Sequence, residues 1–214
     1  MNVEPQAEYY QQSRPEMLAF LPESPQRILD IGCGDGFFGA AVKQKFPTCE
    51  TWGVEAVAEE ARTAALHNDR VITGLLEETV DLPERHFDAV FMNDVLEHMT
   101  WPEPALATAK RILKPQGRLV ISLPNVRYFL NVRDLVFKND WEYQDRGILD
   151  RTHFRFYTTR SAENLLRKNG YVVETVVGIN QPALSLPYRL LFCLAPKFFY
   201  WMRFPQFAIV ARPK

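Results

Sequence analysis

Residues 27–39, Arg-Ile-Leu-Asp-Ile-Gly-Cys-Gly-Asp-Gly-Phe-Phe-Gly, constrain the fold of this chain more than any other stretch. Ile28, Leu29 and Ile31 give the short apolar run typical of a strand buried on both faces of a parallel sheet. Gly32, Gly34 and Gly36 follow, and such a turn lets the backbone approach a ligand closely. A helix expected from about 37 to 46 would add its unpaired N-terminal amides. The sequence therefore predicts a ligand-binding strand, turn and helix.

The spacing of the glycines and the charge of Asp30 indicate what the ligand is. Dinucleotide-binding turns carry G-x-G-x-x-G, but counting from Gly32 places Phe37 at the third glycine. Counting from Gly34 recovers the pattern, so a nicotinamide ligand stays open. Asp30 favours a ligand with a positive ammonium over a pyrophosphate, and S-adenosylmethionine carries such an ammonium. Asp30 could also simply cap the turn.

Length, charge and cysteine content narrow the class of protein. The 214 residues are 47% hydrophobic with a formal net charge of −1, which fits one domain and gives no argument for nucleic acid binding. Three widely spaced cysteines indicate neither a disulfide framework nor a zinc site. The first residues do not resemble a signal peptide, and no apolar run of about 20 residues occurs. We expect a cytoplasmic protein.

Two further predicted strand ends contribute ligand-binding candidates. Glu55 ends the strand 51–55, where a carboxylate can accept hydrogen bonds from both hydroxyls of a ribose. The strand 70–73 is followed by Leu75 and Leu76, which we expect to flank an adenine ring. These features indicate a nucleoside, and they are shared by nicotinamide and S-adenosylmethionine folds.

The strand 87–93 is followed directly by Asp94-Val-Leu-Glu-His98, which should project into the cleft. With this segment, the chain resembles the class I S-adenosylmethionine-dependent methyltransferases over residues 25–180. The matching motifs, in order, are residues 28–36, Glu55, 87–90, 94–98 and 113–121.

This resemblance implies an α/β fold: a doubly wound, Rossmann-like sheet of seven strands, mostly parallel with the last strand antiparallel, and helices on both faces. It implies S-adenosylmethionine as the cofactor and S-adenosylhomocysteine as the product. The cofactor-binding residues that we expect are Arg14, Asp30, Gly32, Cys33, Gly34, Gly36, Glu55, Ala56, Leu75, Leu76, Asn93 and Asp94. Residues 122–127, 141–144 and 149–153 also resemble a bacterial subgroup often associated with cell-surface polysaccharide synthesis.

We expect one domain over residues 1–214, made of four parts. These are an N-terminal lid helix within 1–24, a cofactor-binding core at 25–125, a substrate-recognition insert at 126–160 and an aromatic, basic connection at 180–205. In the lid, Tyr9, Tyr10 and Arg14 are candidates to close over the ligand, with Arg14 pairing with its carboxylate. The alternative is that they decorate a surface helix.

Methyl transfer to a hydroxyl requires alignment of the acceptor and removal of its proton. His98 is the first candidate for the base and His153 the second, because imidazoles titrate near neutral pH and both flank the predicted cleft. Each could instead be a structural histidine. Asp94, Glu97 and His98 also form a D-x-x-E-H pattern that could hold a magnesium or zinc ion.

The connection at 180–205 is rich in leucine and aromatic residues, and no acidic residue follows Glu174. Such a stretch suits contact with a membrane interface or a lipid-linked acceptor. The interpretation we favour is a helical pair packed on the sheet or against a second subunit, as in a homodimer.

We therefore predict an enzyme that transfers a methyl group from S-adenosylmethionine to an oxygen of a small-molecule or saccharide acceptor. Two alternatives stay open from the residues alone. One is a nicotinamide-dependent oxidoreductase, and the other is a non-catalytic binding protein that keeps the cofactor fold.

Overall fold

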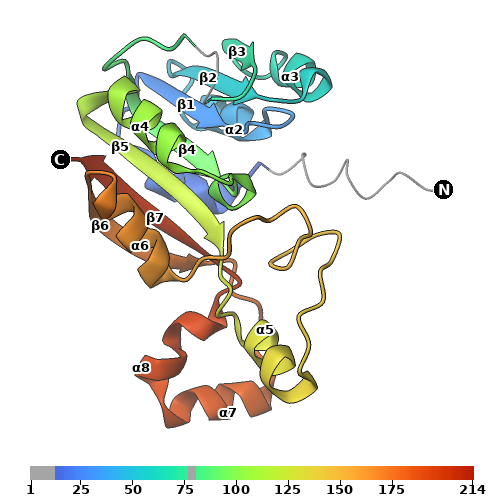
Figure 1. The fold of residues 1–214 in the computed structure, drawn as a ribbon. Helices are drawn as coiled ribbons and strands as arrows, with labels where there is room; N and C mark the ends of the chain where they lie inside the picture. Colours follow the sequence, from blue (N-terminus) through green and yellow to red (C-terminus); the bar gives the residue numbers. More distant parts are fainter. Residues whose placement is uncertain (1–12, 77–80) are drawn as a thin grey trace.

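The computed structural model describes residues 13–76 and 81–214, so Tyr9 and Tyr10 of the expected lid lie outside it. Seven strands form one sheet in the order β3-β2-β1-β4-β5-β7-β6 (Figure 1). The strands are β1 (Arg27–Ile31), β2 (Glu50–Glu55), β3 (Arg70–Thr73), β4 (Phe87–Asn93), β5 (Leu113–Pro124), β6 (Tyr171–Ile179) and β7 (Gln206–Pro213). The helical elements are η1 (Pro15–Phe20), α2 (Phe37–Lys45), α3 (Ala58–Ala64), η2 (Leu96–His98), α4 (Glu103–Ile112), α5 (Phe129–Arg133), η3 (Asp134–Lys138), α6 (Thr159–Lys168), α7 (Leu186–Leu194), α8 (Pro196–Phe199) and η4 (Tyr200–Arg203).

The pairing of the strands confirms the predicted fold class. Strands β3, β2, β1, β4 and β5 are parallel neighbours, and β7 runs antiparallel to both β5 and β6. The chain passes outward from β1 through β2 to β3 and then returns to the other side of β1 with β4. Ligands of open α/β sheets bind at such a reversal, beyond the carboxyl ends of the strands.

The sheet is buried on both faces because its strands are apolar at successive positions. In β1, Leu29 and Ile31 belong to one core cluster and Ile28 to the other. Helices α4 and α6 cover the first face and α2 covers the second (Figure 1). This two-sided burial is the reason that β1 has no polar and apolar alternation in its sequence.

Local sequence signals explain where the helix α6 begins and how α4 is oriented. The Thr158 hydroxyl accepts a hydrogen bond from the Ser161 amide and the Ser161 hydroxyl accepts one from the Thr158 amide, which forms a capping box at the start of α6. In α4, Leu106, Ala109 and Ile112 recur at helical spacing and are fully buried.

The strand β5 begins at Leu113 and so includes residues 114–117, Lys-Pro-Gln-Gly. Its pairing with β4 is irregular between Phe87 and Ala89. Lys114 forms an ion pair with Asp88 at 2.6 Å beside this irregularity. The Pro-Gln-Gly sequence is therefore accommodated by a bulge within the strand.

In the described part of the expected N-terminal lid, residues 13–24, the helix is the short 3₁₀ helix η1. Its Met17 is fully buried against α2 and the sheet. The residue before η1, Arg14, has a left-handed backbone conformation (φ 48°). This turn directs the Arg14 side chain toward the carboxyl ends of β4 and β5.

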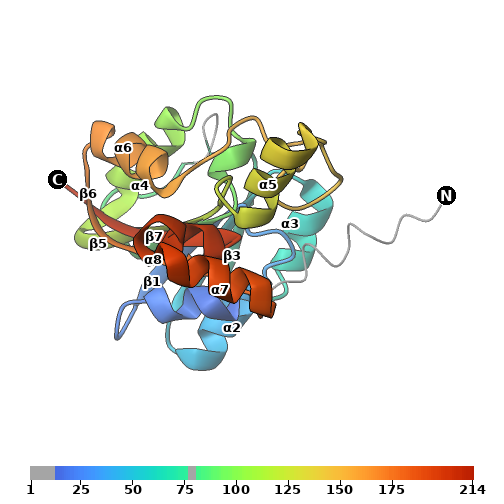
Figure 2. The same cartoon turned by 90° about the horizontal axis from the view of Figure 1, so that it is seen from below.

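A small lobe, formed by α5, η3, α7, α8 and η4, lies beyond the carboxyl-terminal end of β5 (Figure 1). It has its own apolar cluster, centred on Phe129, Phe192 and Met202. The view from below looks directly onto α7 (Figure 2). Of the two packings that we expect for the 180–205 helices, the one on the sheet does not hold for α7, because its aromatic side chains pack on α5. Packing against a second subunit stays a prediction.

Residues 139–158, the later part of the expected insert, contain no helix and no strand beyond isolated bridges. They run from the lobe back to α6 and pass beside η2, where the amides of Phe154 and Arg155 both donate to the carbonyl of Glu97. Within the described residues, no helix is long and apolar enough to cross a bilayer.

The turn after β1 should tolerate an added side chain poorly. Gly36 has φ 82°, and a Cβ there would lie 2.8 Å from the Ala64 backbone. We expect Gly36→Ala to lower the free energy of unfolding by roughly 2–5 kcal/mol, combining left-handed strain with overpacking. The measurement is urea unfolding followed by circular dichroism.

Gly147→Ala is the matched control, because Gly147 has φ 89° with nothing within 4 Å of the added Cβ. This variant should lower the free energy of unfolding by about 1–2 kcal/mol, the cost of the left-handed backbone conformation alone. Equal losses in the two variants would mean that the contact between the turn and α3 does not constrain Gly36.

Candidate active site

Asp30 lies at the end of β1, at the point where the strand order reverses. Its side chain is buried, and its Oδ1 accepts a hydrogen bond from the Asn93 amide of β4 at 3.2 Å. Burial raises the pKa of Asp30 to about 7, against the opposing influence of the Arg14 charge. A buried carboxylate that is costly to ionise has a strong preference for a cationic partner.

Glu55, at the end of β2, joins two loops through its carboxylate. Its Oε2 accepts from the Gly34 amide and its Oε1 accepts from the Val57 amide, both at 2.9 Å. Each carboxylate oxygen retains a free lone pair after these bonds. Glu55 can therefore hold the glycine turn in place and still accept hydrogen bonds from a ligand.

The three turn glycines all have positive φ, 68° at Gly32, 51° at Gly34 and 82° at Gly36. The Gly32 amide donates to the carbonyl of Val54 in β2. Cys33 is buried in the same turn, and burial raises the pKa of its thiol, so it remains protonated. The turn thus brings backbone amides of the chain to the ends of β1 and β2.

Arg14 and Asp94 form the centre of a polar network that joins four distant segments. The Arg14 guanidinium donates to Glu16, to Asp94 Oδ2 at 2.6 Å and to the Ser122 hydroxyl at 2.8 Å. Asp94 also accepts from Ser122 and from the Gln206 amide of β7. The Asp94 carboxylate therefore already accepts hydrogen bonds from three side chains.

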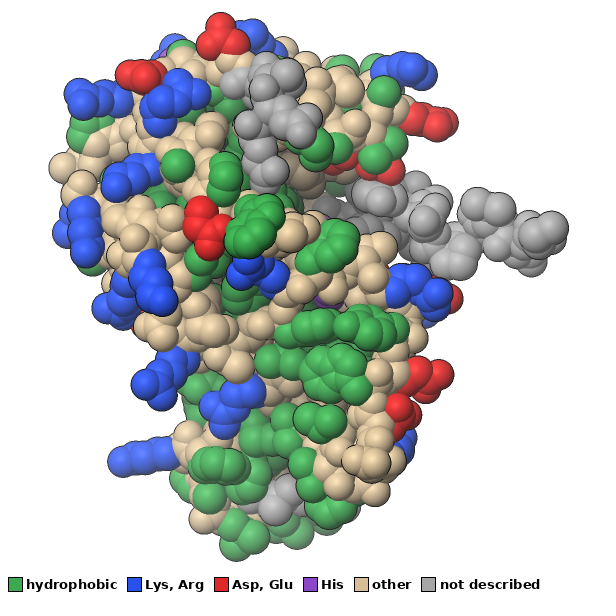
Figure 3. Space-filling model, viewed as in Figure 1, with side chains coloured by type: hydrophobic (Ala, Val, Ile, Leu, Met, Phe, Trp, Pro, Cys, Tyr) green, Lys and Arg blue, Asp and Glu red, His purple; other side chains and the backbone are tan. Residues whose placement is uncertain are grey.

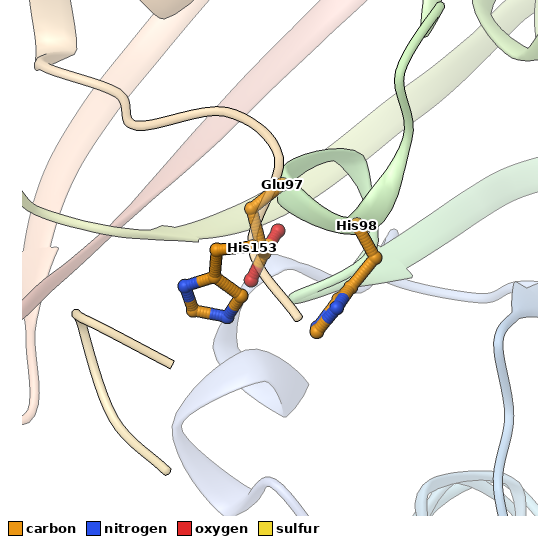
Figure 4. Close-up of side chains that lie close together, drawn as sticks. All are labelled: Glu97, His98 and His153. Atoms are coloured by element: carbon orange, nitrogen blue, oxygen red, sulfur yellow. The ribbon is translucent and has the colours of Figure 1, made fainter. Parts of the chain in front are cut away.

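Glu97, His98 and His153 meet beside this network and offer ligand atoms that lie within 4.8 Å of one another. Figure 4 shows the Glu97 carboxylate between the two imidazole rings in this view, with Glu97 and His98 on η2 and His153 on the insert. The rings are 4.7 Å apart between centroids, at 75°. The predicted D-x-x-E-H set consists of Asp94, Glu97 and His98. In the structure, His153 takes the place of Asp94 beside Glu97 and His98.

Glu97 is buried, and neither of its carboxylate oxygens has a hydrogen-bond partner among residues 13–76 and 81–214. Burial, followed by the nearby Asp94 charge, raises the pKa of Glu97 well above its usual value. An unpartnered buried carboxyl group of this kind is costly to the fold. It is the feature expected of a group that binds a proton, a cation or a substrate hydroxyl.

The hydrogen bonds around His98 determine which ring nitrogen carries a proton. The Thr152 hydroxyl donates to Asp150 Oδ1 at 2.7 Å, so its oxygen accepts from His98 Nδ1, 3.2 Å away. His98 Nε2 is then free of a proton in the neutral ring. Burial, followed by the His153 charge, lowers the pKa of His98 and so favours this neutral form.

His153 has the same tautomer for a similar reason. Its Nδ1 lies 3.1 Å from the carbonyl of Ile148, which can only accept a hydrogen bond. His153 Nε2 is therefore the free acceptor of its neutral ring. Both imidazoles can thus offer an unprotonated nitrogen to a proton or a metal ion.

An open pocket of about 460 Å³ lies next to this cluster and is lined by Tyr143, Arg151, His153 and Phe154. Its aromatic wall continues through Phe156, which packs edge-on against Trp141. All of these residues belong to the expected substrate-recognition insert.

The remaining residues expected to bind the cofactor, Ala56, Leu75 and Leu76, differ in their exposure. Ala56 is exposed at the end of β2, and Leu75 is half-exposed. Leu76 turns into the large core beside the sheet. Of the two leucines expected to flank an adenine, Leu75 alone presents its side chain to the surface.

Several site residues were not found from the sequence. Glu60, near Glu55, has a pKa raised to about 7 by burial and then by the Glu55 charge. Its position in the first turns of the helix after Glu55 was an available signal. Ser122 and Gln206 carried no signal, because their roles depend on β5 and β7 being neighbours of Asp94.

Comparison with known proteins agrees with this geometry. The Methyltransferase domain family matches residues 4–176. A ubiquinone biosynthesis O-methyltransferase of Mus musculus is 32% identical over 170 residues, which are 74% of this chain and 44% of that protein. The protein of the same name from Maricaulis maris is 27% identical over 173 residues, 77% of this chain and 66% of that protein. The chain spans less than half the length of the mammalian relatives.

Solved structures show the same fold. A possible histamine N-methyltransferase of Thermotoga maritima has a TM-score of 0.67 at 23% identity, covering 96% of this chain and 89% of that chain. A methyltransferase of Archaeoglobus fulgidus has a TM-score of 0.68 at 18% identity, covering 95% and 93%.

These matches do not favour the alternative of a nicotinamide oxidoreductase, and they give no support to the polysaccharide-associated subgroup. The seven-stranded sheet agrees with the fold of the matched structures. The chain belongs to the class I S-adenosylmethionine-dependent methyltransferase family.

Proposed function

We propose that this chain transfers a methyl group from S-adenosylmethionine to an oxygen atom of a small acceptor. The observation that carries the proposal is the pair of buried carboxylates, Asp30 and Glu55, at the ends of neighbouring strands on either side of the glycine turn. The relatives named O-methyltransferases support oxygen as the acceptor atom.

In this proposal, Asp30 pairs with the ammonium of the cofactor and Glu55 accepts from its ribose hydroxyls. Asn93 orients Asp30, and Leu75 contacts the adenine. The Arg14 nitrogens that bond Asp94 and Ser122 each carry a second N–H, so Arg14 can also donate to the cofactor's carboxylate. The turn glycines with Cys33, Ala56, Leu76 and Asp94 complete the proposed cofactor site as neighbours of these groups.

The bound cofactor would supply a methyl group attached to a positively charged sulfur. After the transfer, the rest of the cofactor would leave as a neutral thioether. The acceptor oxygen forms the new bond to carbon as the bond to sulfur breaks, and the hydroxyl proton must leave. His98 Nε2 takes this proton, because its Nδ1 proton is held by Thr152. Asp150, through Thr152, then stabilises the imidazolium. His153 is the second candidate for the same role.

The acceptor would occupy the open pocket beside His153, whose aromatic lining suits a ring-shaped molecule. A saccharide, which we expected from the motifs at 122–153, could stack on the same side chains. The names of the relatives support testing hydroxylated ring compounds first. Turnover of labelled cofactor on any acceptor would distinguish an enzyme from a non-catalytic binding protein.

A second candidate role for the same cluster is favoured by the unpartnered Glu97 carboxylate. Glu97, His98 and His153 provide one oxygen and two nitrogen donors, a set that suits zinc and similar divalent ions better than magnesium. Such an ion would polarise the acceptor hydroxyl. In that case the two imidazoles hold the ion and are not available as bases.

The cofactor assignment predicts the effect of removing either carboxylate. Asp30→Ala and Glu55→Ala should each weaken binding of S-adenosylhomocysteine by roughly ten- to a hundredfold, because each loses a charge-assisted contact. Isothermal titration calorimetry measures this directly. Parental affinity in both variants would contradict the placement of the cofactor.

The raised pKa of Asp30, about 7, predicts that cofactor binding depends on pH. Pairing with an ammonium favours the charged carboxylate, so affinity should fall as pH is lowered through 7, by up to about tenfold per unit. Asp30→Asn should bind more weakly and lose this dependence. A parental protein whose affinity is flat between pH 5.5 and 8 would rule out Asp30 as the partner, because that range extends from about one and a half units below its pKa to about one unit above it.

The base assignment predicts that His98→Ala lowers turnover by about a hundred- to ten-thousandfold, while affinity for S-adenosylhomocysteine changes only a few fold. Thr152→Val should lower turnover less and shift the pH profile, because the tautomer of His98 is no longer held. His67→Ala, a histidine that stacks on Phe37 away from the cluster, is the control. A loss confined to His153→Ala would move the base to His153.

The metal alternative predicts that the chain binds cobalt(II) with a visible absorption band typical of nitrogen and oxygen ligands. Glu97→Gln and His153→Ala should each weaken cobalt binding by at least about tenfold, as disturbance of a metal site usually does. Asp94→Asn should retain the band, since Asp94 is outside the cluster. Absence of the band in the parental protein would leave His98 as a base without metal.

A further inference from the structure

The helix α7 is apolar on both of its faces, which is unusual for a helix at the surface of a protein. Tyr188 and Phe192 face inward and pack on Phe129 of α5. The ring centroid of Phe129 lies 4.4 Å from that of Tyr188 and 5.6 Å from that of Phe192. Leu186, Leu190 and Leu194 follow at intervals of four residues and so form a second stripe. Their exposed fractions are 66%, 60% and 82%.

This leucine stripe is part of a larger apolar surface on the lobe, visible as green side chains at its lower end (Figure 3). Further exposed members come from α8, η4 and η3. They are Phe198, Tyr200, Leu135, Val136 and Phe137. Exposed apolar side chains gathered on one lobe, as opposed to scattered singly, indicate an interaction site.

The charges around this surface are almost all positive. Residues 126–138 and 180–205 contain six basic side chains and one acidic side chain, Asp134. Asp134 is paired with Arg133 at 2.6 Å and with Lys138 at 3.2 Å. Arg189 and Lys197 are exposed beside the leucine stripe. In Figure 3 Lys and Arg side chains lie along the left flank of the lobe, and both acidic and basic side chains lie at its right edge.

We propose that this surface, formed by α7, α8 and η3, docks the protein onto an anionic lipid membrane. Leucine and phenylalanine side chains would enter the interface while Arg189 and Lys197 contact lipid phosphates, the combination that holds peripheral proteins on such membranes. None of the described helices can cross a bilayer, so the contact would be interfacial.

Charge argues for lipid over a second copy of the chain. A two-fold contact through the leucine stripe would place the same surface of each copy against the other, so Arg189 and Lys197 would face a surface of the same sign. Asp134 of η3 is already paired with Arg133 and Lys138, and no acidic residue follows Glu174 to offset that repulsion. An anionic membrane supplies the opposite charge across the whole surface.

The position of the lobe relative to the candidate site indicates what the docking would achieve. It lies beyond the carboxyl-terminal end of β5, on the side of the sheet from which the candidate site residues project (Figure 1). An acceptor carried in or on the membrane would then reach the pocket lined by Tyr143 and His153 without crossing bulk water. The docking itself does not depend on the proposed methyl transfer.

The test is co-sedimentation of the full chain with vesicles of phosphatidylglycerol and phosphatidylcholine, compared with vesicles of phosphatidylcholine alone. We expect binding to the anionic vesicles, weakened when salt rises from about 0.1 to about 1 M because the Debye length falls from about 10 to about 3 Å. The double variant Leu190→Asp, Leu194→Asp should lower the partition coefficient by about tenfold or more. Arg189→Glu, Lys197→Glu should lower it by a similar factor.

Leu66→Asp is the matched control, because Leu66 is 81% exposed in the turn after α3, remote from the lobe. It should bind vesicles like the parental protein, and all variants should keep the parental melting temperature. Parental protein that stays in the supernatant overturns the proposal. So does a dimer in sedimentation equilibrium that the leucine variants dissociate while vesicles bind nothing, since the surface would then belong to a second copy.

Discussion

The two hydrogen bonds accepted by Glu55 are the interaction on which the rest of the site depends. One fixes the Gly34 amide in the turn after β1 and the other fixes the Val57 amide after β2. They join two adjacent loops at the reversal of the strand order. Because the backbone supplies the donors, Glu55 is oriented before any ligand arrives, and its remaining lone pairs point where a ribose would lie in our proposal.

The site is also where the structure departs from what stability alone would favour. Asp30 is buried with one amide partner, and Glu97 is buried with none among the described residues. The rest of the fold offsets this cost through a sheet covered on both faces, with fully buried side chains in β1, β4 and β5. Uncompensated polar groups in such a rigid setting are pre-organised for a charged ligand, because little reorganisation is needed when the ligand binds.

In our proposals, the insert and the lobe act on the acceptor through different interactions. Residues 139–158 of the insert have no regular structure and are held to η2 by backbone hydrogen bonds. They therefore position polar and aromatic side chains around His98 and His153. The lobe, by contrast, is a small apolar cluster around Phe192 with an unusually apolar outer surface. In our proposals the first selects the acceptor and the second brings the protein to where the acceptor is found.

The sequence by itself predicted the sheet, which the structure confirms, and the cofactor end of the site, which stays a proposal. Buried strands, turn glycines and acids at strand ends are local signals, so β3, β4 and the roles proposed for Asp30 and Glu55 followed from short stretches. Only the tertiary structure decided which distant residues meet. His153 joins Glu97, and Gln206 joins Asp94, because the insert crosses η2 and β7 pairs with β5. Such contacts depend on how chain segments return to one another in space, and no local pattern of residues encodes that return.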